Sequence, residues 1–206
     1  MPTFPRLANG RVSFPGRASH VKEYDFGWGG SVPAGFTTQG TVAVEGGNGG
    51  GALRVTIASS IAGFTLPDGI DLSDGNVKAI IWTAQGLRYP GSGWPSELFF
   101  SIEGAGTIGG GWRRSPVWLY DRVASPTTVS ARVTTTFLNK PSSSTLSVVM
   151  LPRTKQIALL SGDQCVNMGD FPNLDVSGVA YPKMIFQGSA GNTAAISKLR
   201  LEVRTD

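Results

Sequence analysis

Cysteine and histidine are almost absent from this chain, which has Cys165 and His20 as its single residue of each type. One of each cannot form an intrachain disulfide, a Cys-X-X-Cys redox pair or a zinc site built from cysteines and histidines. Charge is also scarce, because 16% of the residues are charged and 40% are hydrophobic. That balance excludes a disordered polymer, and we expect the 206 residues to fold.

Long stretches without glycine or proline are also missing. The chain has 28 glycines and 13 prolines, and the longest stretches free of both are 127–140 and 192–206. Both residue types interrupt helices, and an average helix needs about 11 residues. The sequence therefore leaves almost no room for helices and predicts an all-β chain.

Alternating patterns of apolar and polar residues predict the strands. Both long stretches alternate with the period of a half-buried strand, and a helix at the C-terminus would place Leu201 on its charged side. Two hairpins are expected, one joining 41–45 to 52–58 and one joining 145–151 to 155–160. Further strands are expected near 77–84, 97–103, 115–121 and 183–187. About ten short strands with glycine-rich turns indicate a β-sandwich or barrel.

Four segments, in this order, resemble a known family: GTVAVEGGNGGGALRVTI, GIDLSDGNVKAIIWT, STLSVVMLPRTKQIALLSGD and AAISKLRLEV. Their succession is similar to the strands of the concanavalin A-like and laminin G-like family, over roughly residues 23 to 204. The resemblance implies a jelly-roll β-sandwich. Such modules are frequent in bacteriophage tail and capsid-decoration proteins, so the resemblance also implies a virion component.

The net charge of +4 is concentrated at the N-terminus, because no acidic residue precedes Glu23 and the rest of the chain is neutral. Prolines and glycines predict an extended arm over residues 1–22, ahead of one domain at 23–206. We expect the arm to contact neighbouring subunits through Phe4, Arg6, Arg11, Phe14 and Arg17. The alternative is that it lies on its own domain as a strand or loop.

No segment resembles a targeting or membrane-spanning sequence. The arm lacks the apolar stretch of about 7 to 15 residues found in signal peptides, and no run approaches about 18 apolar residues. The neutral body offers no basic face to nucleic acid. We therefore expect synthesis in a host cytoplasm and a location in the virion, without membrane insertion or a specific nucleic-acid partner.

Glu23 and Asp25 are the candidate acids for glycoside hydrolysis, the reaction most often found on concanavalin A-like sandwiches. The reaction uses two carboxylates about 5 to 9.5 Å apart, and alternate strand residues are about 6.7 Å apart. The segment KEYDFGW resembles the family's Glu-X-Asp-X-X-Glu catalytic strand, but Gly27 and Trp28 stand where the third acid belongs. We therefore expect a protein that is not an enzyme.

Two other chemical motifs are incomplete. His20 lies in the basic arm, and no Gly-X-Ser-X-Gly motif accompanies it. GAGTIG at 104–109 matches a phosphate-binding pattern, but GGWRRSPVW follows it in place of a helix. We expect a solvated histidine and a long glycine loop.

Three aspartates spaced by three residues, Asp68, Asp71 and Asp74, are weak candidates for calcium binding. They lack the alternating ligands and distal glutamate of an EF-hand, and Asp-Gly pairs also form turns. Laminin G-like modules often bind calcium. We expect no cofactor, with Ca²⁺ as the alternative.

Tryptophans in segments rich in glycine and proline are the strongest candidates for ligand binding. Trp94 and Trp112 are expected in loops, where they either stack on a sugar or partner, or fold back over the ends of the sandwich. The neighbouring residues expected to assist them are Tyr89, Arg88, Arg113 and Arg114. Trp82 and Trp118 lie in strand patterns and are expected in the core.

The sequence as a whole favours a virion structural or assembly protein that is present as a homo-oligomer or in repeated copies. The first alternative is a carbohydrate-binding module that recognises a glycan on the host surface. The second is a glycoside hydrolase that uses Glu23 and Asp25. The identity of the host and of the ligand lies beyond these patterns.

Overall fold

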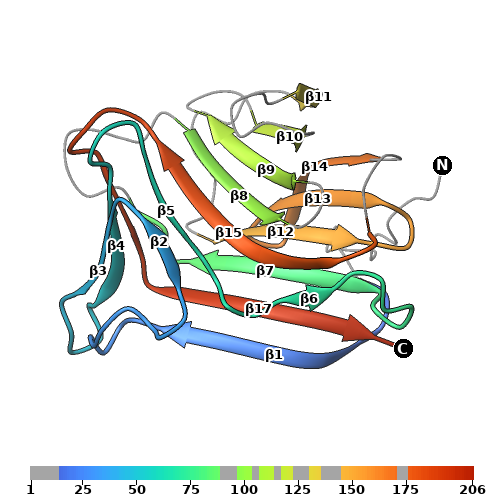
Figure 1. The fold of residues 1–206 in the computed structure, drawn as a ribbon, viewed down its shortest axis with the longest axis horizontal. Coiled ribbons are helices and arrows are strands. Elements are labelled where there is room, and N and C mark those ends of the chain that lie inside the picture. The colour runs from blue at the N-terminus through green and yellow to red at the C-terminus, as the bar shows by residue number, and fades with distance from the viewer. Residues whose placement is uncertain are drawn as a thin grey trace.

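The computed structural model of the chain describes residues 14–88, 97–103, 107–113, 117–122, 130–135, 145–170 and 176–206. These residues form strands in three sheets, with no helix among them (Figure 1). All paired strands are antiparallel. Within the described ranges, no helix is long and apolar enough to cross a membrane.

One layer is a six-stranded sheet. The first and last described strands pair at one edge of it, and strands from the middle of the chain complete it. Its strands, in spatial order, are β1 (Arg17–Asp25), β17 (Lys198–Thr205), β7 (Ala79–Gln85), β12 (Leu146–Leu151), β13 (Gln156–Ser161) and β14 (Gln164–Asp170).

The second layer is an eight-stranded sheet. Its strands, in spatial order, are β11 (Ser130–Thr135), β10 (Val117–Arg122), β9 (Thr107–Arg113), β8 (Glu97–Glu103), β15 (Val179–Gln187), β5 (Ile61–Thr65) and β2 (Thr37–Gln39). The two-residue strand β6 (Ile70–Asp71) pairs with the start of β15.

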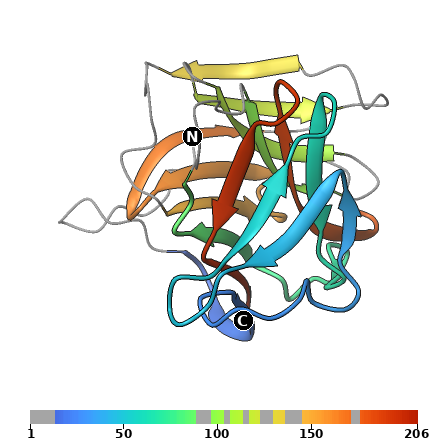
Figure 2. The ribbon, with the colours of Figure 1, turned by 90° about the vertical axis from the view of Figure 1, so that its left-hand side faces the viewer.

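A three-stranded sheet lies at one end of the sandwich, in front in Figure 2. It consists of β16 (Thr193–Ile196), β4 (Ala52–Thr56) and β3 (Thr41–Glu45). Leu53, Val55 and Ile196 from this sheet are buried in the same hydrophobic cluster as the residues of the two large sheets. The small sheet therefore closes one end of the core.

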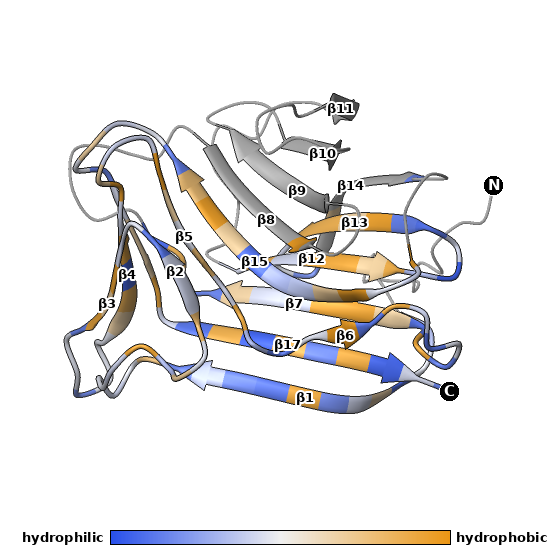
Figure 3. Cartoon of the chain, in the orientation of Figure 1, coloured by the Kyte–Doolittle hydropathy of each residue, from blue (hydrophilic) through white to orange (hydrophobic). Residues whose placement is uncertain are grey.

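The core forms where alternate residues of the facing strands meet. On β17, Leu199, Leu201 and Val203 are buried in the core, and the apolar and polar colours alternate along this strand in Figure 3. Trp82 of β7 and Phe186 of β15 are fully buried in the same cluster. Burying a large apolar side chain contributes about 1.5–3 kcal/mol, so the alternation on β17 favours a strand with its apolar face turned inward.

The strand predictions agree well with this structure. The all-β sandwich, both hairpins and the C-terminal strand are confirmed, as is the buried position of Trp82. The further strands expected by sequence correspond to β7, β8, β10 and β15. Of the long stretch 127–140, β11 occupies Ser130–Thr135, and the rest lies outside the described residues.

The glycine loop expected around residues 104–113 is wrong for its second part. Residues Thr107–Arg113 form β9, which pairs with β8 on one side and with β10 on the other. Glycine disfavours a strand by its entropy alone. Hydrogen-bonded neighbours on both sides outweigh that cost, and no local pattern in the sequence reports them.

The expected arm also ends earlier than residue 22. Residues 17–22 belong to β1, where Arg17 is opposite Thr205 and Lys22 is opposite Leu201. For this segment the alternative interpretation, a strand on its own domain, is the one the structure shows. Of the residues expected in the arm, Phe4, Arg6 and Arg11 lie outside the described residues.

Candidate ligand-binding groove

A groove lies on the outer face of the eight-stranded sheet, where β2, β5 and β15 run side by side (Figure 1). On β5 and β15, Phe64 and Met184 are buried in the core, and Gly63, Thr65, Lys183 and Ile185, which alternate with them, line the groove. Its volume is about 100 Å³. The lining residues are Thr37, Thr38, Gln39, Gly63, Phe64, Thr65, Lys183 and Ile185.

Five of the eight residues that line the groove have polar side chains, and one of these, Lys183, is charged. Threonine hydroxyls both donate and accept hydrogen bonds, the glutamine amide does both through separate atoms, and the lysine ammonium donates. Ile185, which is 9% exposed, adds an apolar side chain. None of the lining residues is a carboxylate, histidine or cysteine. The groove therefore offers hydrogen-bond donors and acceptors together with one cationic group.

Two register rows lead from groove residues across the rest of the sheet. From Ile185 the first row passes through Phe99 and Gly111 to Trp118. From Lys183 the second row passes through Ser101, Gly109 and Tyr120.

Trp112 and Trp118 both lie in strands of the eight-stranded sheet. The prediction of Trp112 in a loop is wrong, because it lies in β9 opposite Leu98, whose partner on β15 is the fully buried Phe186. Trp118 lies in β10, in the strand expected for it, and its place in the core stays a prediction. Sequence alternation identifies the two faces of a strand, but the pairing decides which face meets the core.

Of the other predicted binding residues, Arg88 lies away from the groove. Arg88 forms an isolated bridge with Ala195 beside the small sheet, and its guanidinium donates to the Gly50 carbonyl at 3.5 Å. Arg113 is the last residue of β9. Tyr89, Trp94 and Arg114 lie outside the described residues, so their role remains a prediction.

The candidate catalytic acids lie on β1, in the other sheet. Lys198 Nζ is 2.9 Å from Glu23 Oε2, and Arg200 Nε is 3.2 Å from Glu23 Oε1. The hydrogen bond from Lys198 lowers the pKa of Glu23. Asp25 accepts a hydrogen bond from the Gly27 backbone at 2.9 Å. Each carboxylate thus has its own structural partner, and Glu23 is held in its ionised form.

The three aspartates proposed for calcium also have separate partners. Asp68 accepts hydrogen bonds from Lys22 and Tyr24, at 2.8 and 2.5 Å. Asp71 accepts from Ser73, and Asp74 accepts from the Asn76 backbone at 2.9 Å. The part of the chain that the structure describes contains no group of three acidic, histidine or cysteine residues placed to hold a metal ion.

Trp28 is an exposed aromatic that the sequence analysis did not select. Its side chain is 77% exposed, in the turn that follows β1. Two backbone hydrogen bonds fix this turn, from Gly29 to Phe26 at 3.0 Å and from Gly51 to Gly27 at 2.9 Å. Its sequence signal is a tryptophan flanked by glycines, the same signal that selected Trp94 and Trp112.

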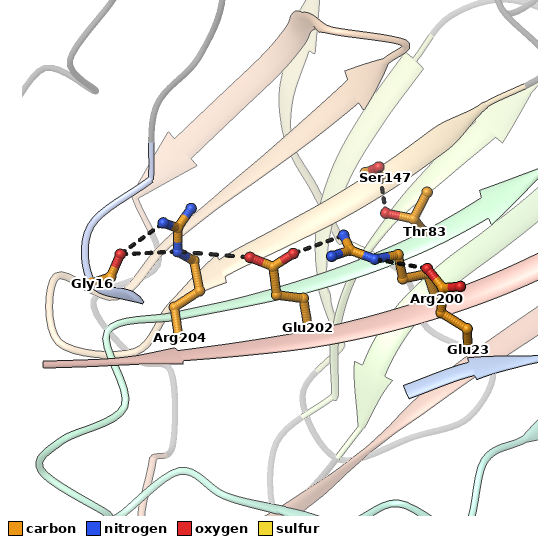
Figure 4. Close-up of polar contacts among 7 residues, drawn as sticks. All are labelled: Gly16, Glu23, Thr83, Ser147, Arg200, Glu202 and Arg204. Atoms are coloured by element: carbon orange, nitrogen blue, oxygen red, sulfur yellow. Dashed lines mark hydrogen bonds and ion pairs between the residues drawn. The ribbon is translucent and has the colours of Figure 1, made fainter. Parts of the chain in front are cut away.

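A charged network covers part of the outer face of the six-stranded sheet (Figure 4). Arg200 and Arg204 flank Glu202 on β17, with the closest contact 2.7 Å from Arg200 to Glu202. Arg200 also contacts Glu23, and Arg204 donates to the Gly16 carbonyl at 2.7 Å.

His20 lies on β1, at a shift in the register with β17. It is exposed to solvent, as the sequence predicts.

A second apolar cluster lies beside this network, on β7, β12 and β13. Its buried members are Ala79, Ile81, Val149, Leu151, Ala158 and Leu160. They alternate with core residues such as Ile80 and Leu159, so they are on the outer face of the sheet. Phe14, one of the residues expected in the arm, packs against this cluster.

No protein-family model and no curated protein sequence matches the chain. Solved structures are nevertheless similar over most of its length. The carbohydrate recognition domain of Emp47p has a TM-score of 0.62 at 13% identity, covering 88% of this chain and 94% of that domain. The CBM2 module of the evolved Dit of Lactobacillus casei BL23 phage J-1 has a TM-score of 0.58 at 10% identity, covering 90% and 96%. A Bacteroides ovatus GH16 protein has a TM-score of 0.58 at 8% identity, covering 87% and 99%.

The chain has a lectin-like jelly-roll fold. The expectation of a concanavalin A-like β-sandwich is confirmed by these likenesses and by the sheet order. At these identities the likeness concerns the fold alone, and the choice of function depends on the residues of this chain.

Proposed function

We propose that this protein is a carbohydrate-binding module that holds a neutral glycan on the outer face of the eight-stranded sheet. The observation that carries the proposal is the groove between β2, β5 and β15, whose lining is rich in hydroxyl groups. The lectin and carbohydrate-binding domains among similar structures support it as well.

The chemistry of the lining supports a glycan over other ligands. Each sugar hydroxyl both donates and accepts hydrogen bonds, as do the hydroxyls of Thr37, Thr38 and Thr65. Ile185 offers an apolar surface to the C–H groups of a sugar ring. Such contacts are individually weak, and repeated copies on a particle would raise the avidity.

Binding to immobilised polysaccharides and to intact bacterial cells tests this proposal. Lys183→Ala and Thr65→Val each remove one hydrogen-bonding group from the groove, and we expect each to weaken binding about threefold to tenfold. Lys198→Ala is the matched control, because it removes a lysine from β17 in the other sheet. Equal losses in Lys183→Ala and Lys198→Ala would overturn the proposal.

Trp94→Ala tests the loop that the sequence favoured. Trp94, Tyr89 and Arg114 lie outside the described residues, and we propose that Trp94 contributes to the same glycan site. If Trp94→Ala loses binding and Lys183→Ala keeps it, the binding site lies near Trp94 and not in the groove.

We further propose that the protein binds glycan without cleaving it. A glycosidase acid needs a raised pKa, whereas the pKa of Glu23 is lowered by its hydrogen bond to Lys198. Glu23 is also ion-paired on the six-stranded sheet, away from the groove. Release of reducing sugar by the wild type, abolished in the Glu23→Gln, Asp25→Asn double variant, would contradict this proposal.

A second candidate function is assembly into a bacteriophage particle, with other virion proteins and further copies of this chain as partners. Phe14 packs on the apolar cluster of its own domain, so the proposed contact with neighbours rests on the basic segment before it, with Phe4, Arg6 and Arg11. The similar phage module is consistent with this context. If assembly is the role, deletion of residues 1–13, which keeps Phe14 and Gly16, abolishes incorporation into particles and leaves glycan binding unchanged. Normal incorporation of the deleted protein would contradict it.

A further inference from the structure

Tyr181 lies next to the groove on the outer face of β15. It alternates with the core residues Ala180 and Met184 and is two residues from Lys183, which lines the groove. Alternate residues of a strand share a face and are about 6.7 Å apart. Tyr181 is 40% exposed, unlike Ile185 at 9%. An aromatic ring therefore stands open to solvent directly beside the groove.

The loop between β5 and β6 packs against the ring of Tyr181 at Gly69. A Cβ atom on Gly69 would lie 2.9 Å from Cε1 and 3.1 Å from Cζ of Tyr181. It would also lie 2.7 Å from a methyl carbon of Val179, which is closer than real Cβ contacts. Only glycine lets the ring rest against the loop backbone, and the loop in turn limits the movement of the ring.

Asp68 fixes the same loop to the six-stranded sheet. Its two carboxylate oxygens accept hydrogen bonds from Lys22 Nζ at 2.8 Å and from Tyr24 Oη at 2.5 Å. Tyr24 is itself held edge-on against Phe36, with ring centroids 5.0 Å apart. Asp68 thus positions Gly69, and Gly69 positions the ring of Tyr181.

We propose that Tyr181 is a stacking subsite that extends the groove, so that the protein binds a glycan chain along β15 rather than a single sugar. The inference rests on the proposed function and adds the size of the ligand to it. Because the loop already restricts the ring of Tyr181, stacking a sugar on its exposed surface would cost little side-chain entropy. One sugar unit occupies the groove beside Thr65 and Lys183, and a following unit stacks on Tyr181.

The experiment is a calorimetric titration with cello-, laminari-, manno- and galacto-oligosaccharides, from the monosaccharide to the hexasaccharide. We expect the affinity of the wild type to rise with chain length. Tyr181→Ala should lose this rise, which is about threefold to tenfold, and keep the wild-type affinity for the shortest ligand that binds. Tyr181→Phe should retain the rise. Gly69→Ala should lose it, because its Cβ displaces the ring.

Trp28→Ala is the matched control, since Trp28 is a more exposed aromatic in a turn that does not line the groove. Thermal melting of every variant separates loss of the subsite from loss of the fold. If Tyr181→Ala keeps the dependence on chain length, or if Trp28→Ala loses it, the subsite is wrong and the groove still stands. If the wild type binds none of the saccharides, the subsite and the proposed function are both overturned.

Discussion

The outer faces of the two large sheets differ in how their polar groups are used. On the six-stranded sheet, Arg200, Glu202 and Arg204 form a chain of contacts within one strand, and Glu23 extends it to β1 (Figure 4). On the eight-stranded sheet, threonines and a glutamine are among the residues that line a groove.

This difference separates stability from binding. Charges that pair with one another on a sheet surface are already satisfied and contribute to the fold. Hydroxyl and amide groups around a groove can exchange their water for a ligand at a small net free energy per bond. We therefore expect substitutions on the six-stranded face to change stability without changing binding, and most substitutions in the groove to do the reverse.

The largest effect is expected from Gly63→Ala, because this position belongs to both the fold and the groove. Its Cβ would collide with the Met184 carbonyl and lie 2.9 Å from the Ile185 Cα. Backbone atoms of a paired strand cannot move aside, so we expect a loss of about 2–3 kcal/mol in the free energy of unfolding. Denaturant unfolding measures it, and unchanged stability would show that β5 and β15 separate more easily than the structure indicates.

Glu202→Gln comes next and tests the six-stranded face. Glu202 is 8% exposed and lies between two arginines. Removing its charge leaves both guanidinium groups without their shared partner, at a cost of about 1–2 kcal/mol that is moderated by their contact with solvent. We expect unfolding at lower denaturant concentration and unchanged glycan affinity. A change in glycan affinity would show that the six-stranded face also takes part in binding.

A smaller effect is expected at acid pH through Asp68, which links the two sheets. Burial raises its pKa, but the hydrogen bonds from Lys22 and Tyr24 outweigh burial and bring the pKa below the ordinary value of 3.8. A lowered folded-state pKa gives stability that is fully present above 3.8 and is lost as the pH falls through the folded-state value. Thermal melting from neutral pH to below 3.8 should therefore show a decline that is shallower in Asp68→Asn. Parallel curves for the two proteins would contradict this linkage.

The smallest effect is expected for Trp28→Ala. This side chain is 77% exposed and belongs to neither outer face described above. Stability and glycan affinity should both stay within the experimental error of the wild type. A clear loss of glycan affinity would identify the turn after β1, and not the groove, as the main binding surface.

Much of the fold follows from local patterns that the sequence displays directly. Leu199, Leu201 and Val203 alternate with charged residues, and this period requires a strand with one buried face. Glycine-rich and proline-containing turns predict the two hairpins for the same local reason. The catalytic hypothesis was already weak at this level, because the motif at Glu23 and Asp25 lacks its third acid.

The candidate site could not be predicted in the same way, because its parts are distant in sequence. Thr37, Thr65 and Lys183 meet in one register row across three strands. Strand pairing also places Trp112 in β9, opposite Leu98 of β8. The sequence by itself determined that the chain forms alternating strands and sharp turns, since those depend on neighbouring residues. Only the tertiary structure decided which strands pair and which face meets the core, because both depend on contacts between residues far apart in the chain.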